Sequence, residues 1–380
     1  MSLFFIVFFA LYTLINSYVF IRGWQALSYV PFLRPLFVLA FLVFSFSYIF
    51  VKIFAEKLPA YIHDPLLWLG SFWFAFLLYF VLFLFLIDLT RLADNFFHFL
   101  SASLRDPSPL TKLYTGIIVC STVLLIVIAG FINRSNFKIK TLELNLPKKE
   151  SILNELNVVM FSDLHLSPIN NEKFLGNIID KVNSLNPDIV LLPGDIVDDN
   201  AAILRRNNIG GSFRKLNPKY GVIACTGNHE FINNADSAVK FMEEFRIKVL
   251  RDSALNIDNA FYVIGREDMS GNNFSGKRRK TLSNLLTTES ENLPRILLDH
   301  TPVQLNDAVK NNIDLQLSGH THNGQMFPLN FITKMVYDVS WGYLKKELTQ
   351  FYVSSGVGTW GPPVKIASDA EIVNIKIKFN

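Results

Sequence analysis

Cysteine is nearly absent from this sequence, which has only Cys120 and Cys225 among its 380 residues. Two cysteines cannot build the disulfide framework of a small secreted domain or a cysteine-rich zinc site. The chain also has no large excess of positive or negative charge, because it contains 36 lysines and arginines and 32 aspartates and glutamates. The chain therefore lacks the strongly basic field of a nucleic-acid-binding protein, and we expect no nucleic-acid partner.

Charged residues of either sign are few, at 18% of the chain, whereas hydrophobic residues make up 50%. A soluble domain contains about 25% charged residues, and a disordered chain contains few apolar ones, so neither description fits. The scarcity is local, because residues 1–134 hold 13 of the 68 charged side chains and 22 of the 35 phenylalanines. The sequence therefore predicts a membrane part followed by a soluble domain, in a multi-pass integral membrane protein.

Four long apolar stretches without a charged side chain occur in the first part: Leu3–Phe20, Leu36–Val51, Leu66–Ile87 and Gly116–Ile132. Each is close to the length of about 17–25 residues with which a helix crosses a membrane. The first is a poor signal peptide, because it lacks a basic start and three further stretches follow it. Buried helices of a soluble protein are the alternative, which four stretches in series disfavour. We therefore expect a four-helix transmembrane region at 1–134.

These stretches are interpreted as an anchor, since ionisable groups inside a membrane usually mark a transport pathway and none lies within them. The loops on the side opposite the termini carry five basic residues: Arg22, Arg34, Arg91, Arg105 and Lys112. The positive-inside rule places such loops in the cytoplasm, so we expect an extracytoplasmic C-terminal domain. Arg134, Lys138 and Lys140 follow the last stretch and favour the opposite orientation.

Beyond the apolar stretches the pattern alternates between strands and helices. Short apolar runs predict buried strands at residues 157–161, 188–192, 222–225, 296–298 and 315–317. Helical spacing predicts helices at 171–185 and 235–245, and the alternating tail 371–379 predicts an edge or half-buried strand. This order indicates an α/β sheet core closed late by antiparallel strands. We expect a linker and first strand at 135–154 and the soluble domain at 155–380.

Residues with metal-binding side chains follow these strands directly. Strand ends in α/β proteins meet at one rim, where ligands bind. An extended backbone at 163–165 and at 320–322 would point residues i and i+2 to the same side. Pairs of divalent ions prefer carboxylate and imidazole ligands and share one carboxylate, a role that suits Asp195. The candidate ligands, enough for two ions, are Asp163, His165, Asp195, Asn228, His300, His320 and His322.

Five short blocks contain these residues and occur in order along the chain. They are Ser162-Asp163-Leu164-His165, Gly194-Asp195-Ile196-Val197-Asp198, Gly227-Asn228-His229-Glu230, Asp299-His300 and Gly319-His320-Thr321-His322. In order and spacing they resemble the motifs of the calcineurin-like metallophosphoesterase superfamily, over about residues 155–380. The stretches 319–325 and 353–359 are similar, more narrowly, to its membrane-tethered bacterial branch.

The resemblance implies a two-sheet β-sandwich flanked by helices, with two divalent metal ions at its rim. Asp163, His165, Asp195 and His322 would hold one ion, and Asp195, Asn228, His300 and His320 the other. His229 would not bind metal; it would face the phosphoryl group of the substrate, and Asp198 would orient it. Mn²⁺, Fe, Zn²⁺ and Mg²⁺ all accept ligands of these types, so the identity of the metal stays open.

Each residue also has an ordinary structural explanation. Asp163 and Asp195 could cap the helices that follow them, and Asn228 could be a turn residue. A lone histidine such as His300 is more often a satisfied core residue than a ligand. Five blocks in order disfavour these explanations taken together, and the intact ligand set disfavours an inactive enzyme that has kept the fold.

Two further segments allow two interpretations each. The basic run 277–280 could hold phosphate headgroups near a bilayer or begin a solvated helix, and the second is favoured. The aromatic segment Phe327–Leu344, which contains Phe331 and Trp341, could lie in the membrane interface and feed a lipid substrate to the metals. It could equally be an insertion that packs into the core.

The sequence as a whole predicts a multi-span helical membrane anchor joined to an α/β metallophosphoesterase domain. The expected reaction is hydrolysis of a phosphodiester or pyrophosphate bond. The anchor, and nothing in the catalytic residues, suggests a lipid-linked substrate and membrane lipid as a partner. One alternative is a phosphatase or phosphodiesterase that acts on soluble molecules, and the other is a non-catalytic metal-binding membrane module.

Overall fold

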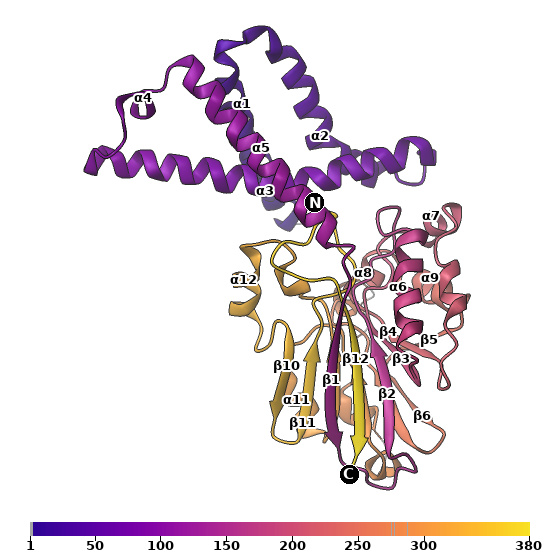
Figure 1. The fold of residues 1–380 in the computed structure, drawn as a ribbon. Coiled ribbons are helices and arrows are strands. Elements are labelled where there is room, and N and C mark those ends of the chain that lie inside the picture. The colour runs from indigo at the N-terminus through magenta and orange to yellow at the C-terminus, as the bar shows by residue number, and fades with distance from the viewer. Residues whose placement is uncertain (1–2, 275, 277, 287) are drawn as a thin grey trace. The chain divides into compact units, whose positions relative to one another are not determined.

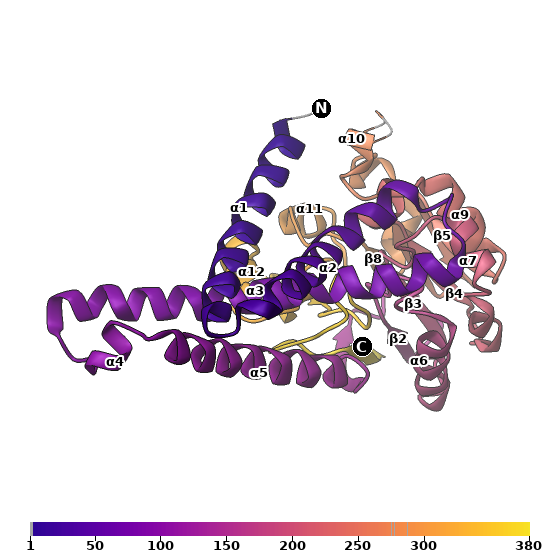
Figure 2. The ribbon, with the colours of Figure 1, turned by 90° about the horizontal axis from the view of Figure 1, so that it is seen from above.

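The computed structural model describes residues 3–274, 276, 278–286 and 288–380. The chain forms two compact units (Figure 1, Figure 2). The helical unit comprises the residues up to Phe131 together with Gly361–Val364. The α/β unit comprises Ile132–Trp360 and Lys365–Asn380.

The helical unit is built from long apolar helices. Its helices are α1 (Leu3–Ala26), α2 (Arg34–Phe54), α3 (Ala60–Phe97), the short α4 (Ala102–Arg105) and α5 (Pro109–Asn133). The four long ones are apolar and long enough to cross a membrane. Proline at the start of a helix needs no hydrogen-bond partner, which suits Pro35 in α2 and Pro109 in α5. With 38 residues, α3 is longer than its apolar run because the helix continues through Asp88 and Arg91.

Aromatic side chains pack α1, α2 and α3 together. The ring of Phe41 in α2 meets Phe20 of α1 and Trp73 of α3 edge-on, with centroids 5.2 and 5.0 Å apart. The indole N–H of Trp73 donates a hydrogen bond to the side-chain oxygen of Asn16 in α1 at 3.0 Å. The one polar atom that Trp73 brings into this apolar contact is therefore satisfied.

The α/β unit is a sandwich of two six-stranded sheets. The first sheet, in spatial order, is β1 (Lys138–Leu146), β12 (Glu371–Phe379), β2 (Glu155–Met160), β3 (Ile189–Pro193), β4 (Val222–Cys225) and β5 (Ile247–Leu250). The second is β10 (Gly342–Lys346), β11 (Thr349–Val353), β9 (Leu315–Ser318), β8 (Arg295–Leu298), β7 (Phe261–Gly265) and β6 (Ser253–Ile257). The strands from β2 to β5 run parallel, as do β7, β8 and β9.

Helices pack on the outer faces of the sandwich, among them α6 (Glu172–Ser184) and α9 (Ala235–Glu243) on the first sheet and α11 (Leu305–Lys310) on the second (Figure 1). The other helices of this unit are α7 (Ala201–Arg206), α8 (Asn228–Ile232), α10 (Gly271–Phe274) and α12 (Leu329–Val336). Alternate residues of β2 show the layering, because Val158 and Met160 face the core between the sheets whereas Val159 packs with α6 and α9. The predicted fold class, apolar N-terminal helices followed by a two-sheet α/β domain flanked by helices, is confirmed.

The C-terminal strand differs from the sequence prediction. The tail 371–379 was expected at an edge or half-buried, but β12 lies inside the first sheet, parallel to β1 and antiparallel to β2. Its first five residues are buried, and the alternation visible in the sequence comes only from Lys376 and Lys378 near its end. The prediction is wrong because β1 covers the outer edge of β12.

Candidate metal centre

The candidate ligands lie in loops that follow parallel strands of both sheets. Asp163 and His165 follow β2, Asp195 follows β3, Asn228 begins α8 after β4, His300 follows β8, and His320 and His322 follow β9. All seven side chains lie at the same rim of the sandwich, in contact with at least one other member of the set. They are buried or half-buried there.

The backbone at these residues is not extended, contrary to the sequence prediction. Left-handed φ angles are found at Asp163 (54°), His165 (49°), Asp195 (53°), His320 (72°) and His322 (48°). This conformation costs a residue with a side chain about 1–2 kcal/mol. It persists where the surrounding structure enforces it, which is common at functional sites. Tight left-handed turns, rather than the alternation of a strand, therefore bring the side chains together.

A first group of ligand atoms joins Asp163, His165 and His322, all within 4.8 Å of one another. The Nε2 atoms of the two imidazoles are 3.0 Å apart, and Nε2 of His322 lies 3.5 Å from Oδ1 of Asp163. Burial and the nearby His165 hold the pKa of His322 well below its usual range, so this imidazole is neutral. A neutral imidazole is the form that binds a metal ion.

A second group joins Asp195, His300 and His320. Oδ2 of Asp195 lies 3.0 Å from Nε2 of His300 and 3.8 Å from Nε2 of His165 in the first group. Nδ1 of His320 lies 2.8 Å from the side-chain oxygen of Asn228. Asp195 is thus the carboxylate at which the two groups meet.

The hydrogen bonds of His300 test whether this site suits a cation. The Pro193 carbonyl accepts a hydrogen bond from Nδ1 of His300 at 2.8 Å, so that nitrogen carries a proton and Nε2 faces the Asp195 carboxylate. Burial alone would lower the pKa of His300, but Asp195 outweighs it and holds this pKa well above the usual range. Nε2 of His300 is buried and makes no hydrogen bond with the described residues, so it is free to bind a cation beside the Asp195 carboxylate. The residues fit a divalent metal.

Two glycines give the ligands room. A Cβ on Gly194, whose φ is +84°, would lie 2.5 Å from Nδ1 of His300. A Cβ on Gly227 would lie 2.6 Å from the backbone nitrogen of Asp195. Only glycine allows the loops after β3 and β4 to approach this closely.

His229 and Asp198 form a pair beside the ligand groups. Nδ1 of His229 lies 2.5 Å from Oδ1 of Asp198, and the imidazole is partly open to solvent, with its side chain 19% exposed. Burial works against a charge on His229, but the Asp195 and Asp198 carboxylates outweigh it and raise its pKa to about 9. Asp198 also accepts a hydrogen bond from Nδ1 of His165 at 3.2 Å, a second contact that the sequence did not predict.

Glu230 is a residue of the site that the sequence reasoning left without a role. Its buried carboxylate accepts hydrogen bonds from the backbone N–H groups of Asp195, Ile196, Val197 and Gly227, at 2.7–3.1 Å. It therefore holds the loop that carries Asp195 against the loop that carries Asn228. The only sequence signal was its place in the block that begins at Gly227.

The basic run 277–280 is not the solvated helix start that the sequence favoured, nor is it all available to headgroups. Nη1 of Arg279 donates to the buried carboxylate of Asp299 at 2.8 Å, and the Arg279 side chain is only 7% exposed. Arg266 contacts the same carboxylate at 3.1 Å. Arg279 thus neutralises a charge next to His300. Lys277 lies outside the described residues.

Two aromatic residues contact the histidines of the site: Tyr337, which belongs to the aromatic segment noted in the sequence, and Trp360, which the sequence reasoning missed. The ring centroid of Trp360 lies 6.3 Å from that of His229, and the ring centroid of Tyr337 lies 6.1 Å from that of His320. Trp360 is half exposed. Aromatic side chains next to a polar centre can bind an apolar or planar part of a substrate.

Comparison with known proteins assigns the part of the chain that contains these residues to a protein family. The family model for calcineurin-like phosphoesterases matches residues 156–324, a range that includes all seven candidate ligands and His229. A metallophosphoesterase of Aquifex aeolicus is 31% identical over 228 residues, which cover 59% of this chain and 85% of that protein. The chain belongs to the calcineurin-like metallophosphoesterase family. The resemblance inferred from the five blocks is confirmed.

Two further relatives have more specific names. The transmembrane protein with metallophosphoesterase domain of Danio rerio is 31% identical over 255 residues, 63% of this chain and 57% of that protein. The UDP-2,3-diacylglucosamine pyrophosphatase LpxG of Chlamydia muridarum is 25% identical over 303 residues, 64% of this chain and 90% of that protein. The chain spans 63–64% of the length of its metallophosphoesterase relatives in Campylobacter jejuni and Helicobacter pylori. With its four apolar helices, this metallophosphoesterase is membrane-associated.

Proposed function

We propose that this chain is a membrane-anchored hydrolase that uses two divalent metal ions to cleave a phosphodiester or pyrophosphate bond. The observation that carries the proposal is the meeting of two ligand groups at Asp195, next to the His229–Asp198 pair. Asp163, His165, Asp195 and His322 would hold one ion, and Asp195, Asn228, His300 and His320 the other.

The chemistry follows from the residues at the rim. Bound divalent ions would supply an activated water and neutralise the charge of the phosphoryl group. In the metal-free chain the Asp195 and Asp198 carboxylates raise the pKa of His229 to about 9, and Asp198 remains as a partner that favours the protonated imidazole when Asp195 binds metal. Asp198 holds Nδ1 of His229, so Nε2 is the atom that donates a proton to the departing oxygen. Asp198 thereby fixes both the orientation and the charge of the acid.

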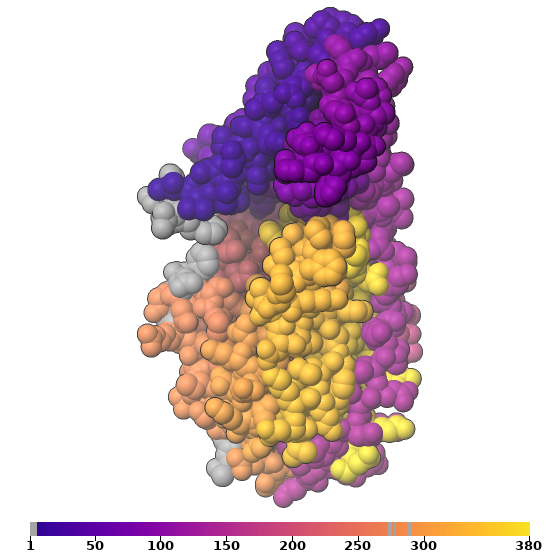
Figure 3. All heavy atoms as spheres, turned by 90° about the vertical axis from the view of Figure 1, so that its left-hand side faces the viewer, coloured from indigo at the N-terminus to yellow at the C-terminus, as the bar shows by residue number. Residues whose placement is uncertain are grey.

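The surface of α12 supports a substrate with a lipid group. None of its residues, all of them described, is buried. The later part of the aromatic segment does pack into the core, through Val339 and Leu344. Phe331 and Ile332 are each 53% exposed and Met335 is 79% exposed. The helix lies on the side of the α/β unit that faces the viewer in Figure 3. The segment follows His320 and His322, and Tyr337 connects it to His320. The name of the LpxG relative, a pyrophosphatase of a diacylated sugar nucleotide, agrees in chemical class.

We also propose that all four long helices cross the membrane and that the α/β unit is extracytoplasmic. The lengths of the helices support this arrangement. Five basic residues support it as well, because they would lie on one side of the membrane if all four helices cross it: Arg22 of α1, Arg34 of α2, Arg91 of α3, Arg105 of α4 and Lys112 of α5. Single cysteines introduced at Ser103 and at Lys378 would test it in intact cells with an impermeant maleimide. We expect labelling at 378 and protection at 103, and the reverse pattern would contradict the proposed orientation.

Metal-dependent hydrolysis by the full chain in detergent tests the proposed activity. Bis-p-nitrophenyl phosphate and p-nitrophenyl phosphate would be offered with Mn²⁺ added or chelated, to wild type, Asp195→Asn and His229→Ala. Asp180→Asn is the matched control, because Asp180 is an exposed carboxylate of α6. We expect metal-dependent turnover that both site variants lose and the control keeps. Preference for soluble esters over lipid esters would favour a merely tethered phosphatase, and bound metal without turnover on any ester would favour a non-catalytic module.

A further inference from the structure

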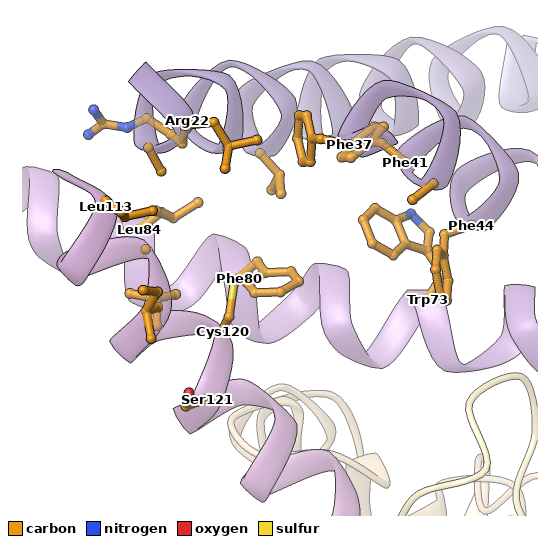
Figure 4. Close-up of a pocket in the computed structure, with 18 residues that line it drawn as sticks. Arg22, Phe37, Phe41, Phe44, Trp73, Phe80, Leu84, Leu113, Cys120 and Ser121 are labelled. Carbon is orange, nitrogen blue, oxygen red and sulfur yellow. The ribbon is translucent and has the colours of Figure 1, made fainter. Parts of the chain in front are cut away.

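An apolar cavity of about 420 Å³ lies inside the helical unit, between α5 and the packed helices α1, α2 and α3 (Figure 4). Its wall is formed by aliphatic and aromatic side chains such as Phe41, Trp73, Phe80 and Leu84. Pockets that hold small molecules in proteins have volumes of about 300–1,000 Å³. The cavity is therefore large enough for a ligand and offers that ligand almost no hydrogen-bonding partner.

The cavity exists because α5 meets the other helices at two separate places. Near one end of α5, Gly116 lies against Ala26 of α1. Near the other end, the ring of Phe131 packs on Phe72 of α3, with centroids 5.5 Å apart. Between these contacts α5 presents small side chains, including Cys120, which leave the space open. In a bilayer such a space fills with hydrocarbon.

One end of the cavity is basic. Arg22 lies at this end in Figure 4. A second hollow, of about 70 Å³, shares Arg22, Leu84 and Gly116 with the cavity and adds Arg91 and Lys112. Arg22 lies four residues before the end of α1, Arg91 lies six residues before the end of α3, and Lys112 lies in the first turn of α5. This is the end of the helices at which lipid headgroups would lie if the helices cross a membrane.

The charge at this end is not balanced. Arg22 is paired with Asp88, which also accepts a hydrogen bond from the hydroxyl of Tyr18 at 2.6 Å. In the part of the chain that the structure describes, no ion pair involves Arg91 or Lys112. Both side chains are half-buried at the mouth of the apolar cavity. Arg91 and Lys112 therefore add two positive charges, without a paired carboxylate among the described residues, at the mouth of the apolar cavity.

We propose that this cavity binds an acyl chain of an anionic glycerophospholipid such as phosphatidylglycerol, with the lipid phosphate held by Arg91 and Lys112. The apolar wall selects hydrocarbon, and the paired Asp88 leaves the other two cations to select an anionic headgroup. Basic pockets between transmembrane helices are suited to anionic headgroups in this way. The proposal rests on the four helices crossing a membrane and does not depend on hydrolysis.

Fluorescence quenching of the full-length protein in mixed micelles tests the proposal. The probes are phosphatidylglycerol and phosphatidylcholine with brominated acyl chains, which quench tryptophan on contact. The cavity signal is the part of the quenching that Trp73→Phe removes, because Trp73 lines the cavity. We expect half-maximal quenching of Trp73 at a mole fraction about 10-fold lower for phosphatidylglycerol than for phosphatidylcholine. Equal curves for the two lipids in the wild type would overturn the proposal without any variant.

Variants separate the two halves of the site. Arg91→Gln combined with Lys112→Gln should reduce the 10-fold preference to less than about 2-fold, because the headgroup loses both cations. Lys52→Gln combined with Lys57→Gln, which removes two lysines outside the cavity, should keep the preference. Cys120→Phe should fill the cavity and abolish the quenching of Trp73 by both lipids. Unchanged preference in the first variant, or unchanged quenching in Cys120→Phe, would contradict the proposal.

Discussion

The two units of the chain use buried polar groups in opposite ways. At the rim of the α/β unit, carboxylates and imidazoles such as Asp195, Glu230 and His300 are buried together. In the helical unit, the buried amide of Asn16 accepts a hydrogen bond from the indole of Trp73 and donates one to the Tyr12 carbonyl, so it joins two helices. Buried charge is costly unless it is paired or bound to metal, so its concentration at one place marks that place as the chemical site. The helical unit is built for packing, and the α/β unit carries the chemistry.

Asp195→Asn should cause the largest loss of activity, because the two ligand groups meet at Asp195. Loss of a shared carboxylate removes several kcal/mol of charge stabilisation, and about 4 kcal/mol corresponds to a 10³-fold loss of kcat/KM. The measurement is turnover of a phosphodiester at saturating Mn²⁺, with Asp180→Asn as the control. A variant within about 10-fold of wild type would show that the rim is not the active site.

His229→Gln should have the next largest effect, a loss of about 10²-fold in kcat on a substrate with a poor leaving group. The loss should shrink towards 10-fold with p-nitrophenol, which departs without a proton. Comparison of an alkyl diester with a nitrophenyl diester measures this difference. The same loss on both substrates would contradict the assignment of His229 as the acid.

The metal-free chain should become less stable as the pH rises through about 9. The pKa of His229 is raised in the folded chain to about 9, against about 6.5 when unfolded. Its pairing with carboxylates therefore stabilises the fold fully below pH 6.5 and is lost as the pH rises through 9, a change of at most about 3 kcal/mol. Urea unfolding of the chelated protein between pH 6 and pH 10 measures it. His229→Gln should remove the share of this dependence that belongs to His229, whereas the share of His300, whose pKa is also raised, should remain. An unchanged slope in His229→Gln would refute the pairing.

Phe331→Ser combined with Met335→Ser should slow the hydrolysis of a membrane-bound substrate but not that of a soluble one, because the change affects substrate delivery and leaves the metal ligands in place. Removal of two exposed apolar side chains from α12 should lower kcat/KM about 10-fold for a phosphodiester presented in vesicles. The rate on a soluble diester should stay within about 2-fold of wild type. An equal loss on both substrates would indicate that α12 supports the site structurally instead.

Asn16→Ala should have the smallest effect and should be confined to the helical unit. It leaves the indole N–H of Trp73 without its acceptor, at a cost of about 1 kcal/mol in the membrane. The thermal midpoint of the helical unit should fall by a few degrees, while the hydrolysis of a soluble diester stays unchanged. A loss of hydrolysis in this variant would show that the two units are coupled.

The sequence predicts most of the site, because its polar residues follow strands whose ends must meet at one rim. The strands β2, β3, β4, β8 and β9 lie within one or two residues of the predicted runs, and these are the strands that precede the ligands. Their apolar residues are buried on both faces, which leaves a continuous apolar run in the sequence. The assignment of the seven residues as metal ligands stays a prediction.

Features that depend on distant partners were not predictable. The position of β12 depends on β1, which lies more than two hundred residues before it in the sequence. The roles of Glu230 and Arg279 depend on which backbone N–H groups and which carboxylate the fold places against them. The left-handed turns at Asp163 and His322 were also not predictable. A residue with a side chain rarely adopts this backbone conformation by itself, and the surrounding fold holds it there.

The metal content of the purified chain tests the central claim most directly. Elemental analysis of wild type and Asp195→Asn, after equilibration with Mn²⁺ and removal of free metal, measures the ions held per chain. We expect two ions per chain in the wild type and a loss of at least one in Asp195→Asn, with Asp180→Asn unchanged. Absence of bound metal in the wild type, or full retention in Asp195→Asn, would contradict the central claim.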